Sequence, residues 1–294
     1  MIEAFLAYLL WGAFPLYFPL LQPAGPVEIL AHRFVWTLAV MAVILLALRK
    51  WRELRGASPR TWGIVAAAAA FIAVNWGVYV YAVNSGHIAE AALGYFINPL
   101  VSVLLGVIFL KERLTFLQKW SVGIAAVAVI VLTIGVGRPP VLALLLAFSF
   151  GFYGLLKKRV SLSATASLTA ESLIMAPLAI AYLVDLGERG TGTFTAEGTG
   201  HALLLASSGL ATALPLLLFG VGAKKIPLST IGLMQYITPM MQMSIAIFIA
   251  GEQLEPARWL GYVIIWVAVA VFVTDLLLRH RRNRRRRRAE RLEG

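Results

Sequence analysis

The sequence has no cysteine, only four histidines and few charged residues. The absence of cysteine excludes disulfide bonds, thiolate metal ligands and thiol nucleophiles. Charged residues make up 14% of the 294 positions and hydrophobic residues 60%, whereas a soluble domain is about 25% charged and roughly 45–50% apolar. A water-soluble fold of this size could not cover so much apolar surface, so the composition indicates that lipid surrounds much of the chain.

Motifs of common catalytic sites are also missing. The sequence contains no His-Glu-X-X-His, no Gly-X-Ser-X-Gly and no phosphate-binding loop motif, and His87-Ile88-Ala89-Glu90 lacks a second histidine. We therefore expect a protein that is not an enzyme and that holds no cofactor and no metal. The sequence also contains no ATPase motif.

Apolar runs of about 20 residues, the length that crosses a membrane, recur along the chain. They predict an all-α integral membrane protein with ten transmembrane helices. The first run has no basic region and no cleavage site before it, so we expect a spanning helix rather than a removed signal. The segment 187–200, rich in Gly and Thr, is the longest connection and is expected to be mobile. The predicted spans are 2–21, 27–48, 62–83, 89–110, 117–136, 139–156, 166–185, 201–221, 228–250 and 257–278.

The net charge of +12 is distributed unevenly between the two predicted membrane faces. Of the 26 Lys and Arg residues, 22 fall in alternate breaks and in the C-terminal tail, and three fall in the other breaks. Since basic loops stay in the cytoplasm, this predicts a multi-pass protein of the bacterial inner (plasma) membrane with both termini cytoplasmic. That orientation requires an even number of spans, which agrees with ten.

Nine of these basic residues lie within the last 16 positions, directly after the last predicted span. We expect residues 280–294 to form a disordered, polybasic cytoplasmic tail that binds anionic lipid headgroups, because basic residues just after a span lie at the headgroup level. A nucleic-acid role is the alternative. The position of the tail beside the last span favours lipid, so no nucleic-acid partner is expected.

Short segments recur at a spacing close to half the chain, which indicates an internal repeat. The spacing of about 140 residues contains five predicted spans, and because five is odd the second half must enter the membrane from the opposite side. This predicts two inverted five-helix repeats, 1–137 and 138–279. The matched segments are 11–14 with 150–153, 88–94 with 226–232, 97–99 with 237–239 and 112–114 with 252–254.

These patterns resemble a known family. The small-residue, Ile-X-Pro and Glu-X-Leu patterns of spans four and nine are similar to the EamA branch of the drug/metabolite transporter superfamily. Further segments resemble the RarD-type permeases of that branch, over nearly the whole chain except the tail. The resemblance implies a ten-helix fold, a central cavity and metabolites, amino acids or drugs as substrates. The segments that carry it are 28–33, Asn75-Trp76, 94–100 and 235–239.

Two polar stripes lie at equivalent places in the two halves, each with the spacing i, i+3, i+7 of one helical face. They are Tyr95, Asn98 and Ser102 in span four, and Gln235, Thr238 and Gln242 in span nine. Pro99 and Pro239 lie beside them and are expected to kink their helices. Polar side chains in lipid either line a cavity or bond between helices. For the symmetric pair of stripes we favour a cavity between the repeats.

Ionisable residues inside the predicted spans are few and costly. Arg33 lies within span two, and we expect it to attract an anionic or zwitterionic substrate carboxylate. Glu28 and His32 are one turn apart and can touch, and Glu171 lies in span seven. These three residues are candidates for proton coupling or for a structural ion pair.

Aromatic and amide side chains add further candidates for the cavity wall. We expect Trp11, Asn75, Tyr79 and Tyr153 to line it, because aromatic walls with a few polar groups suit small substrates. The alternative is that they pack in the bundle or anchor it at the membrane interface.

Together these features predict a secondary transporter, permease or exporter, that works by alternating access. The expected partner is a small-molecule substrate, namely a metabolite, an amino acid or a drug, and the expected assembly is a monomer or a homodimer. An ion or solute channel and a non-transporting receptor or scaffold are the alternatives. The internal two-fold favours the transporter, because inverted repeats with a site at their interface suit alternating access.

Overall fold

The computed structural model describes residues 1–84, 87–136, 140–249 and 256–290, and within these ranges it contains helices and short connections but no strand. The helices are α1 (Ile2–Gly12), α2 (Phe14–Tyr17), the 3-10 helix η1 (Phe18–Leu21), α3 (Pro26–Ala47), α4 (Trp51–Arg55), α5 (Pro59–Asn84), α6 (Ile88–Leu110), α7 (Phe116–Val136), α8 (Val141–Arg159), α9 (Ala164–Glu188), α10 (Gly198–Lys225), α11 (Leu228–Met234), α12 (Ile237–Phe248) and α13 (Pro256–Glu290).

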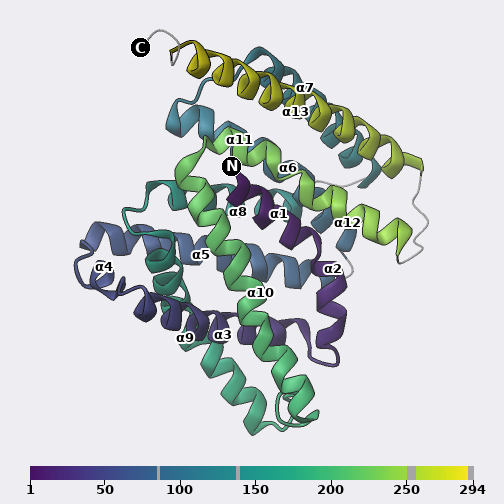
Figure 1. The fold of residues 1–294 in the computed structure, drawn as a ribbon. Helices are drawn as coiled ribbons and strands as arrows, with labels where there is room; N and C mark the ends of the chain where they lie inside the picture. The colour runs from purple at the N-terminus through teal and green to yellow at the C-terminus, as the bar shows by residue number, and fades with distance from the viewer. Residues whose placement is uncertain (85–86, 137–139, 250–255, 291–294) are drawn as a thin grey trace.

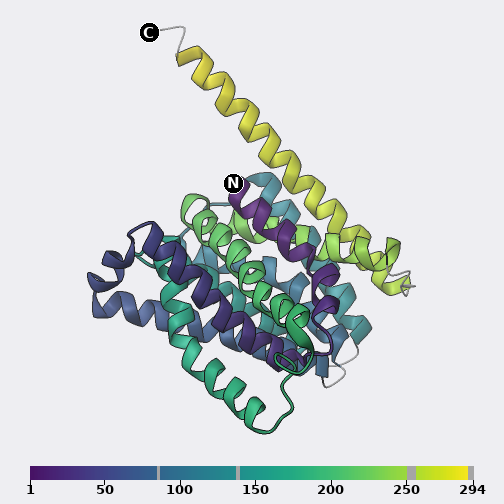
Figure 2. The ribbon, with the colours of Figure 1, turned by 60° about the horizontal axis from the view of Figure 1, so that its bottom comes forward.

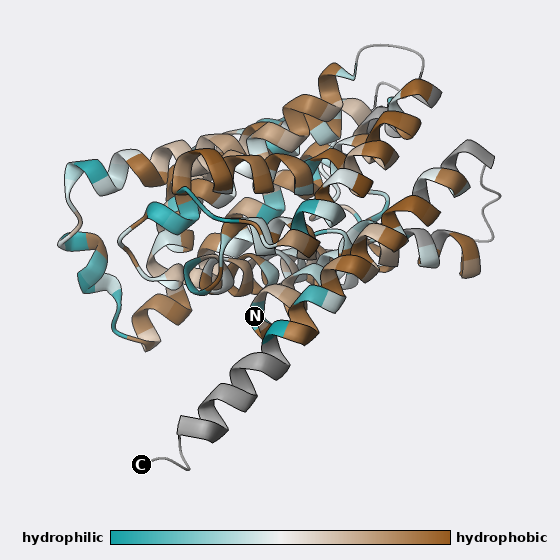
Figure 3. Cartoon of the chain, turned by 90° about the horizontal axis from the view of Figure 1, so that it is seen from above, coloured by the Kyte–Doolittle hydropathy of each residue, from teal (hydrophilic) through white to brown (hydrophobic). Residues whose placement is uncertain are grey.

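Nine helical segments within the described residues are long and apolar enough to cross a membrane. They coincide with predicted spans one to eight and ten, and the first combines α1, α2 and η1. The chain is therefore a multi-pass membrane protein, and the all-α prediction is confirmed. Brown, hydrophobic helices dominate Figure 3, and the teal stretches concentrate at connections.

The predicted span at 228–250 is not one helix. It is divided into α11 and α12 at Gln235-Tyr236. Pro239 lies in the first turn of α12 and has no backbone N–H, so the carbonyl of Gln235 cannot receive the usual helical bond from that position. Pro99, by contrast, lies inside a continuous α6.

The helices form a bundle with one long pair along its edge (Figure 1). In that pair α7 packs on α13, while α6 packs on α8 and α11. On the other side α3 contacts both α9 and α10, and α10 also crosses α1. The pairs bury the small and polar faces of the helices and leave large apolar side chains such as Ile134, Phe116 and Val43 exposed, as expected of surfaces that face lipid.

The C-terminal segment differs from the predicted disordered tail. Helix α13 continues to Glu290, well past Leu278, where its apolar run ends, and it projects from the bundle in Figure 2. The segment 280–290 is rich in arginine and also holds alanine and glutamate, all of which are strong helix formers, so the helix can continue beyond the apolar span. Residues 291–294 of the predicted tail lie outside the described residues.

Helices α3 and α10 approach each other closely at Gly209. A Cβ atom at this position would lie 2.4 Å from the backbone carbonyl carbon of Trp36, a distance at which the backbone must move. The hydroxyl of Thr37 donates to the carbonyl of Gly209 over 3.2 Å, which holds the two helices in register.

We predict that Gly209→Ala lowers the thermal unfolding temperature in detergent, because overpacking costs about 1–3 kcal/mol. The matched control is Gly123→Ala on α7, where an added Cβ meets nothing within 4 Å. There, alanine should be neutral or stabilising by about 0.5–1 kcal/mol through helix propensity. Equal unfolding temperatures for the two variants would contradict the close approach.

Candidate functional site

Arg33 carries a cation into the apolar part of α3 and is surrounded mainly by rings. Its guanidinium carbon lies 4.2 Å from the ring centroid of Trp76, 5.4 Å from that of Phe18 and 5.9 Å from that of Phe14. Its Nε donates to the hydroxyl of Thr212 on α10 over 2.9 Å. The cation–π contacts and the one hydrogen bond hold the guanidinium in place, but they do not neutralise it.

Three phenol groups complete the surroundings of Arg33. Tyr17, Tyr79 and Tyr95 lie within electrostatic range of the guanidinium, and the rings of Tyr79 and Tyr95 meet edge to face at 6.0 Å. Among the described side chains no carboxylate forms an ion pair with Arg33. The site therefore offers one cation, several ring faces and hydroxyl groups.

A second buried charge cluster joins α8 and α9. Lys157 donates to Glu171 over 2.7 Å and to Ser167 over 2.9 Å. Ser167 also donates to Glu171 over 2.6 Å, and the hydroxyl of Tyr153 donates to its other oxygen over 3.1 Å. The side chains of Lys157 and Glu171 are 1% and 4% exposed, so water does not screen this pair and each charge depends on the other.

A narrow cavity of about 10 Å³ lies next to both features. Thr212 and Trp76, which hold Arg33, form part of its wall, and Tyr153 and Glu171 form another part. The remaining lining residues are Phe34, Thr37, Ile72, Leu168, Ser172, Met175 and Leu216. Five helices, α3, α5, α8, α9 and α10, thus enclose a mostly apolar space with a few polar groups, which is the usual composition of a small-molecule site.

The predicted proton-coupling candidates Glu28 and His32 lie together, beside the connection between α9 and α10. Thr193 donates its backbone N–H to Glu28 over 2.7 Å and its hydroxyl over 3.1 Å. His32 lies 4.0 Å from Glu28 and stacks on Phe194 with a centroid distance of 4.8 Å. His201 bonds Thr193 over 2.8 Å. This connection, expected to be mobile, is thus fastened by Thr193 and Phe194 onto α3.

The two polar stripes do not line the cavity described above. Asn98 and Ser102 are buried where α6 packs on α11, and a Cβ at Gly232 would lie 2.8 Å from the Cβ of Ser102. Thr238 donates to the carbonyl of Tyr8 over 2.9 Å. The geometry here is that of contacts between helices, the alternative reading of the stripes.

Other predicted wall residues also bond between helices. Gln242 donates to the carbonyl of Trp11 over 3.2 Å, and the Trp11 ring meets Phe150 at 5.8 Å. Asn75 donates to the carbonyl of Leu146 over 2.8 Å and to the Ser149 hydroxyl over 3.1 Å. Gln235 is buried at the break between α11 and α12. Of the predicted wall residues, Tyr153 lines the cavity, and Arg33, Tyr79 and Tyr95 gather beside it.

The sequence reasoning missed Lys157, Thr212 and the contacts of Thr193. Lys157 is one of the basic residues between the predicted spans 139–156 and 166–185, although its side chain is buried. A signal was available, because a glutamate within a span needs a counterion and Lys157 is one of three cations in the last turn of the preceding helix. No comparable signal marks Thr212, since nothing distinguishes it from other hydroxyl residues in apolar helices.

Glu112 has a structural position. It accepts hydrogen bonds from the backbone N–H groups of Leu228 and Ser229 over 2.7 and 2.8 Å, and so caps the N-terminus of α11. The segment 112–114, one of the matched repeat segments, thus provides a contact between helices. Its repeat equivalent, Glu252, lies outside the described residues.

Comparisons with known proteins agree with this architecture. The chain matches the EamA-like transporter family over residues 1–134 and again over residues 138–274. It is 49% identical to the protein RarD of Streptomyces exfoliatus over 97% of this chain and 91% of the relative. It is 44% identical to the uncharacterized transporter YojE of Bacillus subtilis over 90% of each, and 30% identical to the chloramphenicol-sensitive protein RarD of Pseudomonas aeruginosa over 90% and 89%.

A solved crystal structure shares the fold. Its TM-score is 0.69 with 18% sequence identity, and the match covers 92% of this chain and 96% of that one. The multi-pass helical bundle with its small, mostly apolar cavity is that of a membrane protein, and the family match places it in the transporter class. The chain belongs to the EamA-like transporter family, in which it is a RarD-type permease.

The Lys157–Glu171 pair yields a stability prediction. Lys157→Met should lower the free energy of unfolding in detergent by about 3–5 kcal/mol, because it leaves a buried carboxylate without a counterion. The double variant Lys157→Met/Glu171→Gln should recover most of that loss, since the amide still accepts from Ser167 and Tyr153.

The control for this prediction is the exposed pair of Arg189 and Asp185, whose side chains are 69% and 48% exposed. Arg189→Met should change stability by less than about 1 kcal/mol. If Lys157→Met were as mild as this control, the pair would not be buried as described.

Proposed function

We propose that the protein is a secondary transporter of the bacterial inner membrane that moves small metabolites bearing an acid group by alternating access. The observation that carries this proposal is Arg33, a cation inside an apolar helix that is held by rings and one hydroxyl beside the cavity. Such a charge is costly in a membrane unless it is paired or serves function. A substrate carboxylate would supply the missing anion.

The pattern of helix contacts supports two inverted five-helix repeats within a ten-span bundle, with α11 and α12 as the two parts of span nine. A rotation that exchanges the halves pairs α1 with α8, α3 with α9, α5 with α10, α6 with α11 and α12, and α7 with α13. Under this exchange the α1–α10 contact becomes the α8–α5 contact, and the α6–α8 contact becomes the α12–α1 contact. The contacts α3–α9, α6–α11 and α7–α13 map onto themselves.

Individual contacts repeat in the same way. A Cβ at Gly12 would lie 2.7 Å from Met241, and a Cβ at Gly151 would lie 2.8 Å from Val101. Both the glycines and their partners are related by the repeat spacing of 139 or 140 residues. The double match to one family, with its boundary between residues 134 and 138, further supports repeats at 1–137 and 138–279.

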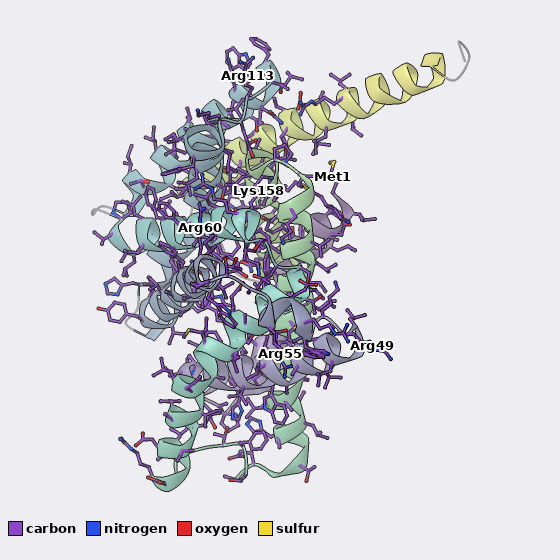
Figure 4. All side chains as sticks on the ribbon, turned by 90° about the vertical axis from the view of Figure 1, so that its left-hand side faces the viewer. Met1, Arg49, Arg55, Arg60, Arg113 and Lys158 are labelled. Atoms are coloured by element: carbon purple, nitrogen blue, oxygen red, sulfur yellow. The ribbon has the colours of Figure 1, made fainter. Side chains whose placement is uncertain are left out.

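The basic connections support a cytoplasmic location for both termini. Figure 4 shows the left-hand side of Figure 1, with Met1 and basic residues of three connections labelled. Those residues are Arg49, Arg55, Arg60, Arg113 and Lys158. With both termini in the cytoplasm, the connection that contains Thr193 and Phe194 lies on the opposite, outer side of the membrane. The tail from residue 280 would then lie at the inner leaflet, where anionic headgroups attract it.

The narrow cavity and the fastened Thr193–Phe194 connection support a conformation closed to the outside. A cavity of about 10 Å³ has room for about one water molecule, so substrate entry requires the helices to separate. Glu28 and His32 would take up a proton when that connection lifts, and Glu171 would do so when Lys157 moves away. Alternating access then exposes the Arg33 site to one face at a time.

The transport prediction concerns Arg33. The solute is first found by thermal-shift screening of the purified protein against organic acids, amino acids and drugs such as chloramphenicol, and is then followed by counterflow in proteoliposomes. Arg33→Gln should reduce counterflow about tenfold or more, because a hydrogen bond to a charged group contributes about 1.5–3 kcal/mol. Arg189→Gln, which removes an exposed cation, should transport normally. Wild-type counterflow in Arg33→Gln would overturn the proposed site.

A second prediction concerns the Thr193–Phe194 connection. The chain has no cysteine, so a single cysteine at Ser172 reports access to the cavity. Adding Phe194→Ala removes the stacking on His32 and should speed labelling by an impermeant maleimide from the outside about two- to tenfold. The matched control adds Phe116→Ala, at an exposed side chain of α7. Equal rates with and without Phe194 would show that the connection does not close the cavity.

A further inference from the structure

We propose that the transported solute is an organic monoanion, with one acid group, no ammonium group and an apolar body. This inference rests on the proposed function and narrows its substrate class. It follows from the balance of buried charges around the cavity, and it separates simple organic acids from amino acids, amines and dianions.

The first part of the argument is that Glu171 is already occupied. Its oxygens accept from Lys157, Ser167 and Tyr153 at distances between 2.6 and 3.1 Å. The Lys157 ammonium and the Glu171 carboxylate balance one another in a region where neither reaches water. Glu171 is the one carboxylate among the residues that line the cavity, so no further carboxylate of the lining is free for a positively charged solute.

The second part is that Arg33 is left over. Its described contacts are three aromatic rings and the Thr212 hydroxyl. Glu28 lies on the same helix but accepts from Thr193, beside His32 and His201. Two cations, Arg33 and Lys157, therefore contact lining residues of the cavity, which itself has one carboxylate, Glu171. A bound group with a single negative charge makes the sum of these charges zero.

The same balance disfavours the other charge classes. An amino acid would add an ammonium group near Arg33 and Lys157 and would leave one positive charge uncompensated in a low-dielectric space. An amine would add a charge without cancelling any. A dianion would leave one negative charge uncompensated. A neutral amide could bond Arg33 but would leave its charge unpaired.

The apolar body follows from the wall of the cavity. The lining includes Trp76, Phe34, Leu168, Met175 and Leu216. Trp76 also touches Arg33, so a solute whose acid group meets the guanidinium has apolar surface directly beside it. A body of aromatic or aliphatic carbon buries area there, whereas a polar body would lose its water without replacing the hydrogen bonds.

The test measures binding of matched probes to the wild-type protein by thermal shift. On one carbon skeleton the probes are 3-phenylpropionate, phenylalanine, 2-phenylethylamine, 3-phenylpropanamide and benzylmalonate. Indole-based and linear aliphatic series repeat the comparison with other bodies. In at least one series the monoacid should bind about tenfold or more tightly than its amino-acid, amine, amide and dianion counterparts. Equal or tighter binding of an amino acid or amine, or no binding of any monoacid in the three series, overturns the proposal.

Variants connect the preference to Arg33. Arg33→Gln should bring the acid-to-amide affinity ratio close to one, and Arg33→Lys should keep a preference for the acid. Arg189→Gln serves as the control and should keep the wild-type ratio. Where Arg33→Gln does not fold, Arg33→Lys and the wild-type series still decide the question.

Counterflow of the bound probes then separates this inference from the function on which it rests. Transport of an amino acid or amine in preference to the acid would be consistent with the proposed transport function but would refute the proposal that the solute is a monoanion. Binding of the acid without counterflow of any probe would instead refute transport.

Discussion

A charge that has left water must be matched by another charge, and this constraint organises the centre of the protein. The pairing of Lys157 with Glu171 satisfies it within the chain, through an ion pair and two hydroxyl donors. Arg33 does not satisfy it within the described residues. The Lys157–Glu171 pair is neutral as a whole, whereas Arg33 leaves an unpaired positive charge beside the cavity. This unpaired charge distinguishes the site from the contacts that hold the helices together.

Neutral polar contacts hold the helices together. Asn75, Thr238 and Gln242 each donate to a backbone carbonyl of a neighbouring helix. In lipid such bonds give direction to the packing of helices whose apolar faces alone would slide past one another. Glycines supply the complementary condition, because Gly209 and Gly232 bring backbones together where a side chain would hold them apart.

The helical architecture and most of the polar residues that matter were predictable from the sequence, but their grouping was not. Nine of the ten predicted spans coincide with helical segments of the described residues that are long and apolar enough to cross a membrane, since the membrane thickness sets that length. The stripe 95, 98 and 102 was visible as a helical face, yet sequence spacing cannot tell a face that meets another helix from one that meets a cavity. Lys157 illustrates the limit, because a cation at the end of a helix can point outward to water or inward to an acid.

Arg33 could be predicted because a cation deep in an apolar run is improbable without a function. Its partners could not, since Phe18, Trp76 and Thr212 come from three other helical segments and meet only in the folded chain. The hydrogen bonds that hold the connection at Thr193 could not be predicted for the same reason. Its Gly and Thr content describes the chain in isolation, whereas the hydrogen bonds to Glu28 depend on α3.

The break between α11 and α12 has a mechanical consequence. The first half is fastened to α6, through Gly232 against Ser102 and through Glu112 at its N-terminus. The second half is fastened to α1, through Thr238 on Tyr8 and Gln242 on Trp11. One continuous helix that contacts both α6 and α1 would resist a relative motion of these two helices. A helix broken in the middle can instead change the angle between its two parts. The break at Gln235 and Tyr236 therefore places these two sets of contacts on separate helices, so that a change of angle between α11 and α12 would not by itself break either set.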